Sequence, residues 1–184
     1  FVGPSQYAHF PVIRLELDLG VLEQWPTGRL GQAFVDALID AVPELAQHGC
    51  SYKEPGGLIR RMRENEGTWL GHVLEHVAIE LQNMAGEDVT FGRTRSIDGR
   101  AGVYSVVYEY AQREEGIEAG ELALKLLSSL LPDELKSERA VPADWSWPDA
   151  RDAFIRFAQQ RALGPSTASL VLAAEECGIP CVRL

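Results

Sequence analysis

Apolar and polar residues change their spacing several times along this chain, and the spacing predicts both strands and helices. Residues 11–19 alternate apolar and charged side chains, as a half-buried strand does. Residues 28–47 have apolar side chains at helical spacing, and Pro43 is expected to disturb or end the regular part. A polar loop with several glycines follows at 48–57, before a short helix at 58–62.

The most regular helical pattern covers residues 68–84, and a pair of strands is expected after it. Residues 88–97 and 102–110 are rich in β-branched and aromatic side chains, and the Asp98-Gly99 pair between them favours a turn. They predict an antiparallel hairpin. Helical spacing returns at 118–131. Together these elements predict an α+β fold, in which a short, mainly antiparallel sheet is covered by helices.

The regular pattern is lost at 131–148, where proline and charged residues accumulate, and this segment is the best candidate for a linker. The elements expected beyond it are two helices and a short apolar strand, at 147–163, 166–177 and 179–184. A strand at the end of such a segment cannot bury both of its faces, so the sequence looks cut inside a following domain. We therefore expect a first domain at 1–145 and, at 146–184, a helical linker with the beginning of a second domain.

The composition is ordinary for a soluble globular protein, with 46% hydrophobic and 24% charged residues. A net charge of −10 argues against a nucleic-acid partner, because phosphate contacts need Lys and Arg. No apolar run approaches the roughly 20 residues that cross a bilayer, so no membrane partner is expected. The three cysteines are too few for a disulfide framework and favour a reducing cytoplasm. No glycine-rich phosphate loop is present, which argues against a self-sufficient nucleotide enzyme.

The strongest chemical signal is the pentapeptide His72-Val-Leu-Glu75-His76, an H-x-x-E-H motif in the central helical segment. At 100° per residue, both histidines and Glu75 fall on one polar side of the helix, away from its apolar stripe. Two histidines at i and i+4 can bind one divalent metal, and the carboxylate can activate a metal-bound water, as in one class of zinc peptidases. A histidine pair on a polar helix face is more often solvated or hydrogen-bonded, so the motif alone leaves both interpretations open.

Four longer phrases are together similar to the N-terminal region of cyanophycin synthetases. They are HGCSYKEPGG at 48–57, EGTWLGHVLEHVAIELQNMAG at 66–86, FGRTR at 91–95 and ALGPSTASLVLAAEECGIP at 162–180. The resemblance implies a cytoplasmic, homo-oligomeric ATP-dependent ligase that builds a poly-aspartate backbone and attaches arginine to each side chain. The ligase reactions belong to ATP-grasp and Mur-ligase-like domains that use ATP and Mg²⁺. Because the last phrase matches only the entry to the ATP-grasp domain, we expect no ligase activity from this fragment.

The resemblance implies that the N-terminal domain docks the growing polymer and, in some members, cleaves it in a metal-dependent reaction that creates new chain ends. On the motif correspondence, His72 and His76 would be zinc ligands and Glu75 the general base. Cys50, in the phrase HGCS, is the first choice for the third ligand because a thiolate binds zinc well. Its alternative interpretation is a small buried hydrophobic residue.

Glu80, one turn beyond His76, and His48, two residues before Cys50, are the alternative metal ligands. An exposed glutamate and a histidine that faces solvent, or supports a ligand from outside, are their plainer interpretations. Asn65 and Glu66 lengthen the segment before Gly-Thr-Trp relative to the usual family pattern, so the distance from the loop to the helix could differ here.

An aspartate–arginine polymer presents guanidinium groups and carboxylates, which suggests substrate contacts for four further residues. Arg93 and Arg95, beside the expected hairpin, are candidates for carboxylate contacts. Glu109 could pair with a guanidinium, and Trp69 could stack on an arginine side chain. The alternatives are solvated hairpin charges and a tryptophan packed in the core.

The preferred hypothesis is therefore a zinc-dependent amide hydrolase that acts on cyanophycin or a related polymer. A noncatalytic docking and scaffold domain of the synthetase is the main alternative. An independent zinc peptidase for small peptides ranks last, because it does not explain the ATP-grasp-like tail.

Overall fold

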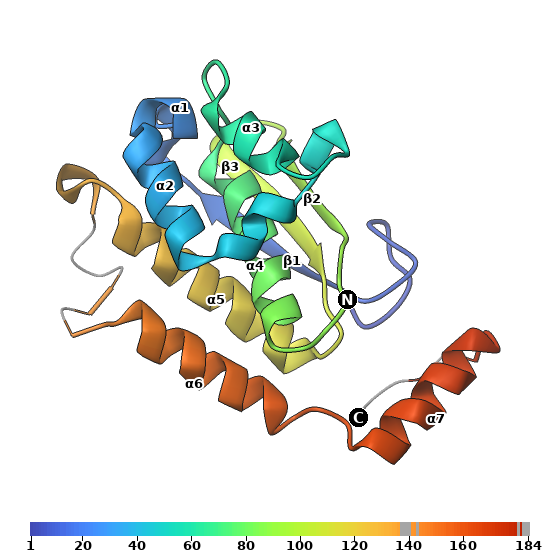
Figure 1. The fold of residues 1–184 in the computed structure, drawn as a ribbon. Helices are drawn as coiled ribbons and strands as arrows, with labels where there is room; N and C mark the ends of the chain where they lie inside the picture. The colour runs from blue at the N-terminus through green and yellow to red at the C-terminus, as the bar shows by residue number, and fades with distance from the viewer. Residues whose placement is uncertain (137–140, 143, 180, 182–184) are drawn as a thin grey trace.

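The computed structural model describes residues 1–136, 141, 142, 144–179 and 181. Within these residues, three strands form one antiparallel sheet in the order β1-β3-β2 (Figure 1). Their bounds are Val12–Asp18 for β1, Gly92–Ile97 for β2 and Arg100–Glu109 for β3. The expected hairpin is confirmed, with Gly99 in its turn at a positive φ of 74°. The α+β class and the antiparallel sheet are confirmed with it.

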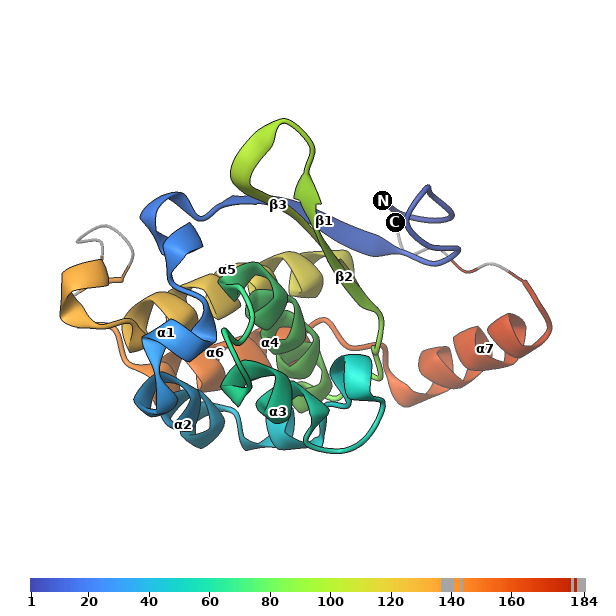
Figure 2. The same cartoon turned by 90° about the horizontal axis from the view of Figure 1, so that it is seen from above.

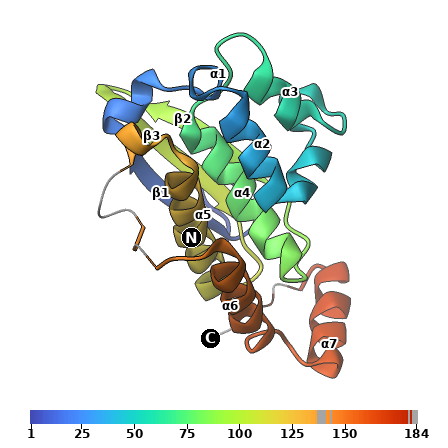
Figure 3. The same ribbon diagram turned by 60° about the vertical axis from the view of Figure 1, so that its left-hand side comes forward.

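One face of the sheet is covered by helices, as the view from above shows (Figure 2). Helix α4 (Leu70–Met84) packs on β2 and β3, and α5 (Arg113–Leu130) packs beside α4 and on β1. A further layer formed by α2 (Gln32–Ala41) and α3 (Gly57–Arg63) lies beyond α4 (Figure 3). Helix α4 therefore has neighbours on both sides.

The alternation of the strands decides which side chains meet the helices. Leu15 on β1 lies opposite Val106 on β3, and Thr94 on β2 lies on the other side of Val106. Val106 is fully buried, and Thr94 Oγ1 lies 3.3 Å from the Gly71 carbonyl of α4. This register places the small inward side chains of β2 against the helix that carries the histidine pair.

The segment expected as one helix at 28–47 is divided at a glycine and a proline. Helix α1 (Thr27–Leu30) ends at Gly31, which has a φ of 89° and separates it from α2. Pro43 ends the α-helical part, and a 3₁₀ helix (Pro43–Gln47) follows. Helix α5 begins five residues before the expected start, because its first turn is charged and lacks the apolar spacing that marks the rest.

Helix α6 (Trp147–Gln159) packs against α5, with Phe154 and Ala158 buried in the core. Helix α7 (Pro165–Glu176) lies at the edge of the molecule (Figures 1 and 2). It is followed by Gly178 at a φ of 72°, which suits a helix end. The apolar strand expected at 179–184 falls largely outside the described residues. The domain division at 145 and the ATP-grasp link stay predictions.

No helix in the described part of the chain is both long and apolar enough to cross a membrane.

Glu115, in the first turn of α5, is buried without a hydrogen-bond partner. It is 1% exposed, and neither carboxylate oxygen has a partner among the described residues. Burial, with a smaller contribution from the negative charge of Glu87, raises the pKa of Glu115 to about 7 from an ordinary 4.5. A pKa raised by folding stabilises the protein below the unfolded pKa, and this stability is lost as the pH rises through the folded pKa.

We therefore expect Glu115→Gln to gain stability relative to the parent protein as the pH rises. The difference in unfolding free energy should change by about 2 kcal/mol in favour of the variant between pH 5 and pH 8. Urea denaturation at the two pH values measures this difference in unfolding free energy. Comparing the two pH values cancels any effect of the substitution that does not depend on pH. The exposed neighbour Glu114→Gln is the matched control. A difference that does not depend on pH would contradict this role of Glu115.

Candidate metal centre

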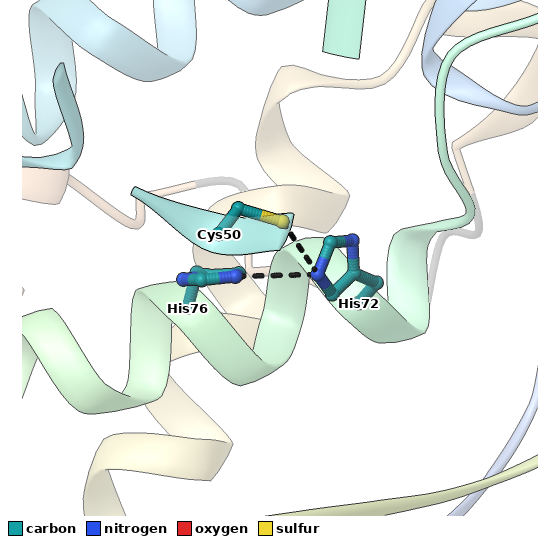
Figure 4. A group of neighbouring side chains, drawn as sticks. All are labelled: Cys50, His72 and His76. Carbon is teal, nitrogen blue, oxygen red and sulfur yellow. Dashed lines mark hydrogen bonds between the residues drawn. The ribbon is translucent and has the colours of Figure 1, made fainter. Parts of the chain in front are cut away.

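Three ligand-type side chains converge where the loop at 48–52 meets α4. His72 and His76 lie one helical turn apart, with their Nε2 atoms 3.2 Å from each other. Cys50 Sγ approaches from the loop and lies 3.4 Å from His72 Nε2 (Figure 4). One ligand atom from each residue lies within 4.8 Å of the other two. The structure thus brings together the three residues that the sequence selected as metal ligands.

Cys50 reaches this position because its loop folds tightly against the start of α3. The amide of Leu58 donates to the carbonyl of His48 (2.9 Å), and the amide of Lys53 donates to the carbonyl of Gly49 (3.0 Å). A Cβ atom at Gly57 would lie 1.9 Å from the carbonyl oxygen of Gly49, so only glycine allows this approach. Cys50 itself has a φ of 48°, a left-handed conformation that is strained for a residue with a side chain.

The segment that contains Asn65 and Glu66 does not separate the loop from the helix. Asn65 takes a left-handed conformation, with a φ of 50°, and the amide of Gly28 donates to the carbonyl of Glu66. This segment therefore packs beside α1, while Cys50 reaches His72.

Glu75 lies in the same cavity as the cluster, on the side of β2. It accepts a hydrogen bond from Thr94 Oγ1 at 2.6 Å. A Cβ atom at Gly92 would lie 2.4 Å from Glu75 Oε1, so the absence of a side chain at Gly92 makes room for the carboxylate. Burial raises the pKa of Glu75 to about 7, against the opposing effects of Thr94, Arg95 and Arg93.

Burial also determines the charge of the two histidines. It lowers the pKa of His72 to about 4, with a smaller effect of Arg61, and the pKa of His76 to about 3, with smaller effects of His72 and His48. Both imidazoles are therefore neutral at pH 7, which is the form that binds a metal. Two neutral imidazoles and one thiol, which binds as thiolate, match the donors that zinc prefers.

A second group of side chains contacts the histidines from outside the cluster. His48 Nδ1 lies 2.9 Å from His76 Nδ1, and His48 Nε2 lies 2.7 Å from Glu80 Oε2. Thr68 Oγ1 lies 2.9 Å from His72 Nδ1. Among the residues that the structure describes, His48 and Glu80 do not join the candidate metal cluster. The two alternative ligands thus contact each other, and His48 contacts His76.

The cluster opens into a cavity of about 850 Å³. Its lining includes Trp69, Arg95 and Glu75 of the predicted site, together with Arg61 and Tyr104. Trp69 is held there by a hydrogen bond from its Nε1 to the Glu23 carbonyl at 3.0 Å. The cavity is large enough for an extended ligand rather than a single water or ion.

Two other predicted substrate residues have different contacts. The guanidinium of Arg93 lies over the ring of Phe91, 5.8 Å from its centroid. Glu109 Oε2 accepts hydrogen bonds from the backbone N–H groups of Thr90 and Phe91. This carboxylate therefore fixes the backbone of the two residues just before β2. The structure therefore brings Arg95 and Trp69 to the cavity, while Arg93 and Glu109 organise the hairpin beside it.

Sequence reasoning missed the two threonines that support the site. Thr68 stands four residues before His72, so helical spacing could have revealed it. Thr94 could not be found this way, because its contact with Glu75 depends on how β2 packs over α4.

The model of the cyanophycin synthase-like N-terminal domain matches residues 13–132. The chain belongs to this family. It is similar to the cyanophycin synthetases of Trichormus variabilis, at 37% identity, and Synechocystis sp., at 38% identity, over 99% of its length. It covers 19% and 20% of those two relatives, so it spans about a fifth of their length.

The cyanophycin synthase-like match begins inside β1 and ends just after α5, so it contains the sheet and the whole cluster. Helices α6 and α7 lie beyond it, although the similarity to the two synthetases extends through them. The resemblance that the four sequence phrases indicated is thereby confirmed.

Gly57 offers a test of the cluster that leaves every candidate ligand unchanged. Gly57→Ala should displace the carbonyl of Gly49 and with it Cys50, and should weaken zinc binding about tenfold or more, which is ~1.4 kcal/mol. Competition with a chromophoric chelator measures the affinity, and thermal unfolding of the metal-free protein reports whether the fold survives. Gly164→Ala is the control, because a Cβ there meets nothing within 4 Å. Equal zinc affinities in a folded Gly57→Ala protein would contradict the role of the loop.

Proposed function

We propose that this domain is a zinc-dependent amide hydrolase that cleaves cyanophycin or a closely related aspartate–arginine polymer. The observation that carries the proposal is the convergence of Cys50, His72 and His76 at a cavity that also contains Glu75. The polymer is suggested by the similarity to proteins named cyanophycin synthetase.

The three residues would hold the metal from two elements, the histidines from α4 and the thiolate from the loop before α3. A zinc ion held in this way supplies Lewis acidity, which polarises an amide carbonyl and makes water more acidic. The donors fit because the histidines are neutral at physiological pH and the cysteine is directed at them by a conformation that needs Gly57.

Glu75 would act as the proton carrier of the reaction. As general base it takes a proton from the attacking water, and as general acid it returns a proton to the leaving amine. Thr94 holds one carboxylate oxygen and thereby fixes the orientation of the side chain. Burial favours its protonated form more than water does, which suits a group that must both accept and release a proton.

The other cavity residues suit a polymer that carries both guanidinium groups and carboxylates. Arg61 and Arg95 offer positive charge for carboxylates of the substrate. Trp69 and Tyr104 offer aromatic surfaces on which a guanidinium can stack. Tyr104 is oriented by a hydrogen bond from its hydroxyl to Glu23 Oε1 at 2.9 Å.

Cleavage inside a longer polymer would supply new chain ends for a ligase. We place the domain at the N-terminal end of such a cytoplasmic, homo-oligomeric synthetase, whose ATP-grasp and Mur-ligase-like domains would use ATP and Mg²⁺. This placement is supported by the similarity to synthetases about five times as long as the chain.

A noncatalytic docking domain is the second candidate, and the hydrogen bonds of the histidines favour it. Thr68 contacts His72, and His48 contacts His76, so both rings have polar partners without a metal. In this alternative the cavity would bind polymer, and the histidine contacts would serve only the fold.

Glu75→Gln and His76→Ala distinguish the two functions. We expect Glu75→Gln to retain zinc and to lose at least ~100-fold in cleavage rate, because the amide cannot accept the proton. We expect His76→Ala to lose both zinc and cleavage. Elemental analysis of protein purified without added metal gives the zinc content. The change in polymer chain length, with and without a chelator, gives the activity.

Full cleavage by the Glu75→Gln protein would exclude this role for Glu75. Tight polymer binding by the parent protein, with neither zinc nor chelator-sensitive shortening, would establish the docking domain instead. The exposed Glu44→Gln serves as the control for loss of a single negative charge.

A further inference from the structure

His76 is connected to a buried carboxylate through His48. The carboxylate of Glu80 contacts His48 Nε2 at 2.7 Å, and His48 Nδ1 contacts His76 Nδ1 at 2.9 Å. The remaining nitrogen of His76, Nε2, faces the candidate metal cluster, 3.2 Å from His72 Nε2. The side chains of His48 and Glu80 are only 15% and 9% exposed, so water competes little for these hydrogen bonds.

The direction of the hydrogen bonds follows from the chemistry of the three groups. An ionised carboxylate only accepts, so His48 Nε2 must carry the hydrogen and donate it to Glu80. When Nε2 carries the single hydrogen of the His48 ring, Nδ1 keeps a lone pair, which accepts the hydrogen from His76 Nδ1. This leaves a lone pair on His76 Nε2, which is the atom that faces His72 in the cluster.

The contact on His72 does not impose such a direction. Its Nδ1 meets the hydroxyl of Thr68, which can donate or accept a hydrogen bond. His72 can therefore take either neutral tautomer without losing this partner. The two histidines are alike in the sequence motif, yet only His76 has an outer contact that selects the metal-binding tautomer.

We propose that Glu80 and His48 are positioning residues, which hold His76 in the Nδ1–H tautomer and in the ring orientation that binds the metal. This proposal rests on the metal cluster of the proposed function. It gives the two alternative ligands a different role, since they act on the metal through His76. It also explains why a helix with an enclosed polar side keeps a glutamate one turn beyond the motif, where Glu80 is 7% exposed.

Glu80→Gln is the first test, because the amide has nearly the same shape but no longer requires His48 to donate. Zinc affinity, measured by chelator competition, should fall about 10- to 100-fold, as for other partners of metal-binding histidines. His48→Gln should have a similar effect. The double variant should bind zinc no more weakly than the weaker single variant, because both residues act along one path. Glu44→Gln changes an exposed glutamate that lies near His48 in the sequence, and this control should bind zinc like the parent protein.

A second measurement needs no substitution. In zinc-loaded parent protein, long-range ¹H–¹⁵N NMR should assign the hydrogen of His76 to Nδ1. The cobalt-loaded Glu80→Gln protein should show altered visible absorption bands, since His76 is held less firmly. A merely structural role would change the melting temperature of the metal-free protein and leave the tautomer and spectrum unchanged.

Several results would overturn the proposal. Unchanged zinc affinity in both single variants, additive losses in the double variant, or a hydrogen on Nε2 of zinc-loaded His76 would each do so. Failure of the parent protein to bind zinc would overturn the proposed function together with this positioning role. Zinc binding and cleavage by the parent, with unchanged affinity in Glu80→Gln, would remove only the positioning role.

Discussion

The site depends on one constraint, which is that α4 has its polar side inside the protein. Glu75 is 4% exposed although it lies opposite the apolar stripe of the helix, and Glu80, at the edge of that stripe, is 7% exposed. Buried polar groups cost several kcal/mol unless they are paired, so each one requires a partner from a neighbouring element. Glu75 has a hydrogen-bond contact with Thr94, and His72 has one with Thr68. His48 contacts both His76 and Glu80.

Close backbone approaches make this enclosure possible. The loop reaches α4 only because Gly57 lets the carbonyl of Gly49 pass, and β2 reaches it only because Gly92 leaves room for Glu75. Gly57 thus determines the position of the Cys50 thiol, and Gly92 determines the position of the Glu75 carboxylate. Both are outside the histidine motif, and a Cβ at either would displace a functional group without altering its chemistry.

Much of this arrangement followed from sequence patterns. Spacing alone identified the central helix and its histidine pair, and alternation with the Asp98-Gly99 turn identified the hairpin. The enclosure of the polar helix face was not predicted, because periodicity reports which residues are polar but not what covers them. Cys50 was proposed from its residue type and family phrase, while its position depends on a left-handed backbone and a glycine crossing that have no periodic signal.

The charged residues of the hairpin show the same limit. Arg95 lines the cavity, whereas Glu109 caps the loop that enters β2 by accepting two backbone N–H groups. Their sequence setting does not distinguish these roles, since both are charged residues on neighbouring strands. The distinction comes from the register of β2 and β3 and from the way the chain enters the sheet, which are long-range features.

Charge acts on the proposed substrate at two scales. The chain carries a net charge of −10, which would attract the guanidinium groups of the proposed polymer. Near the cluster, Arg61 and Arg95 line the cavity, and they repel guanidinium groups but attract carboxylates. The overall charge would therefore favour the guanidinium groups of the polymer at the surface, while the local charge would favour its carboxylate groups beside Glu75. Such a division suits a hydrolase whose proposed substrate carries both guanidinium groups and carboxylates.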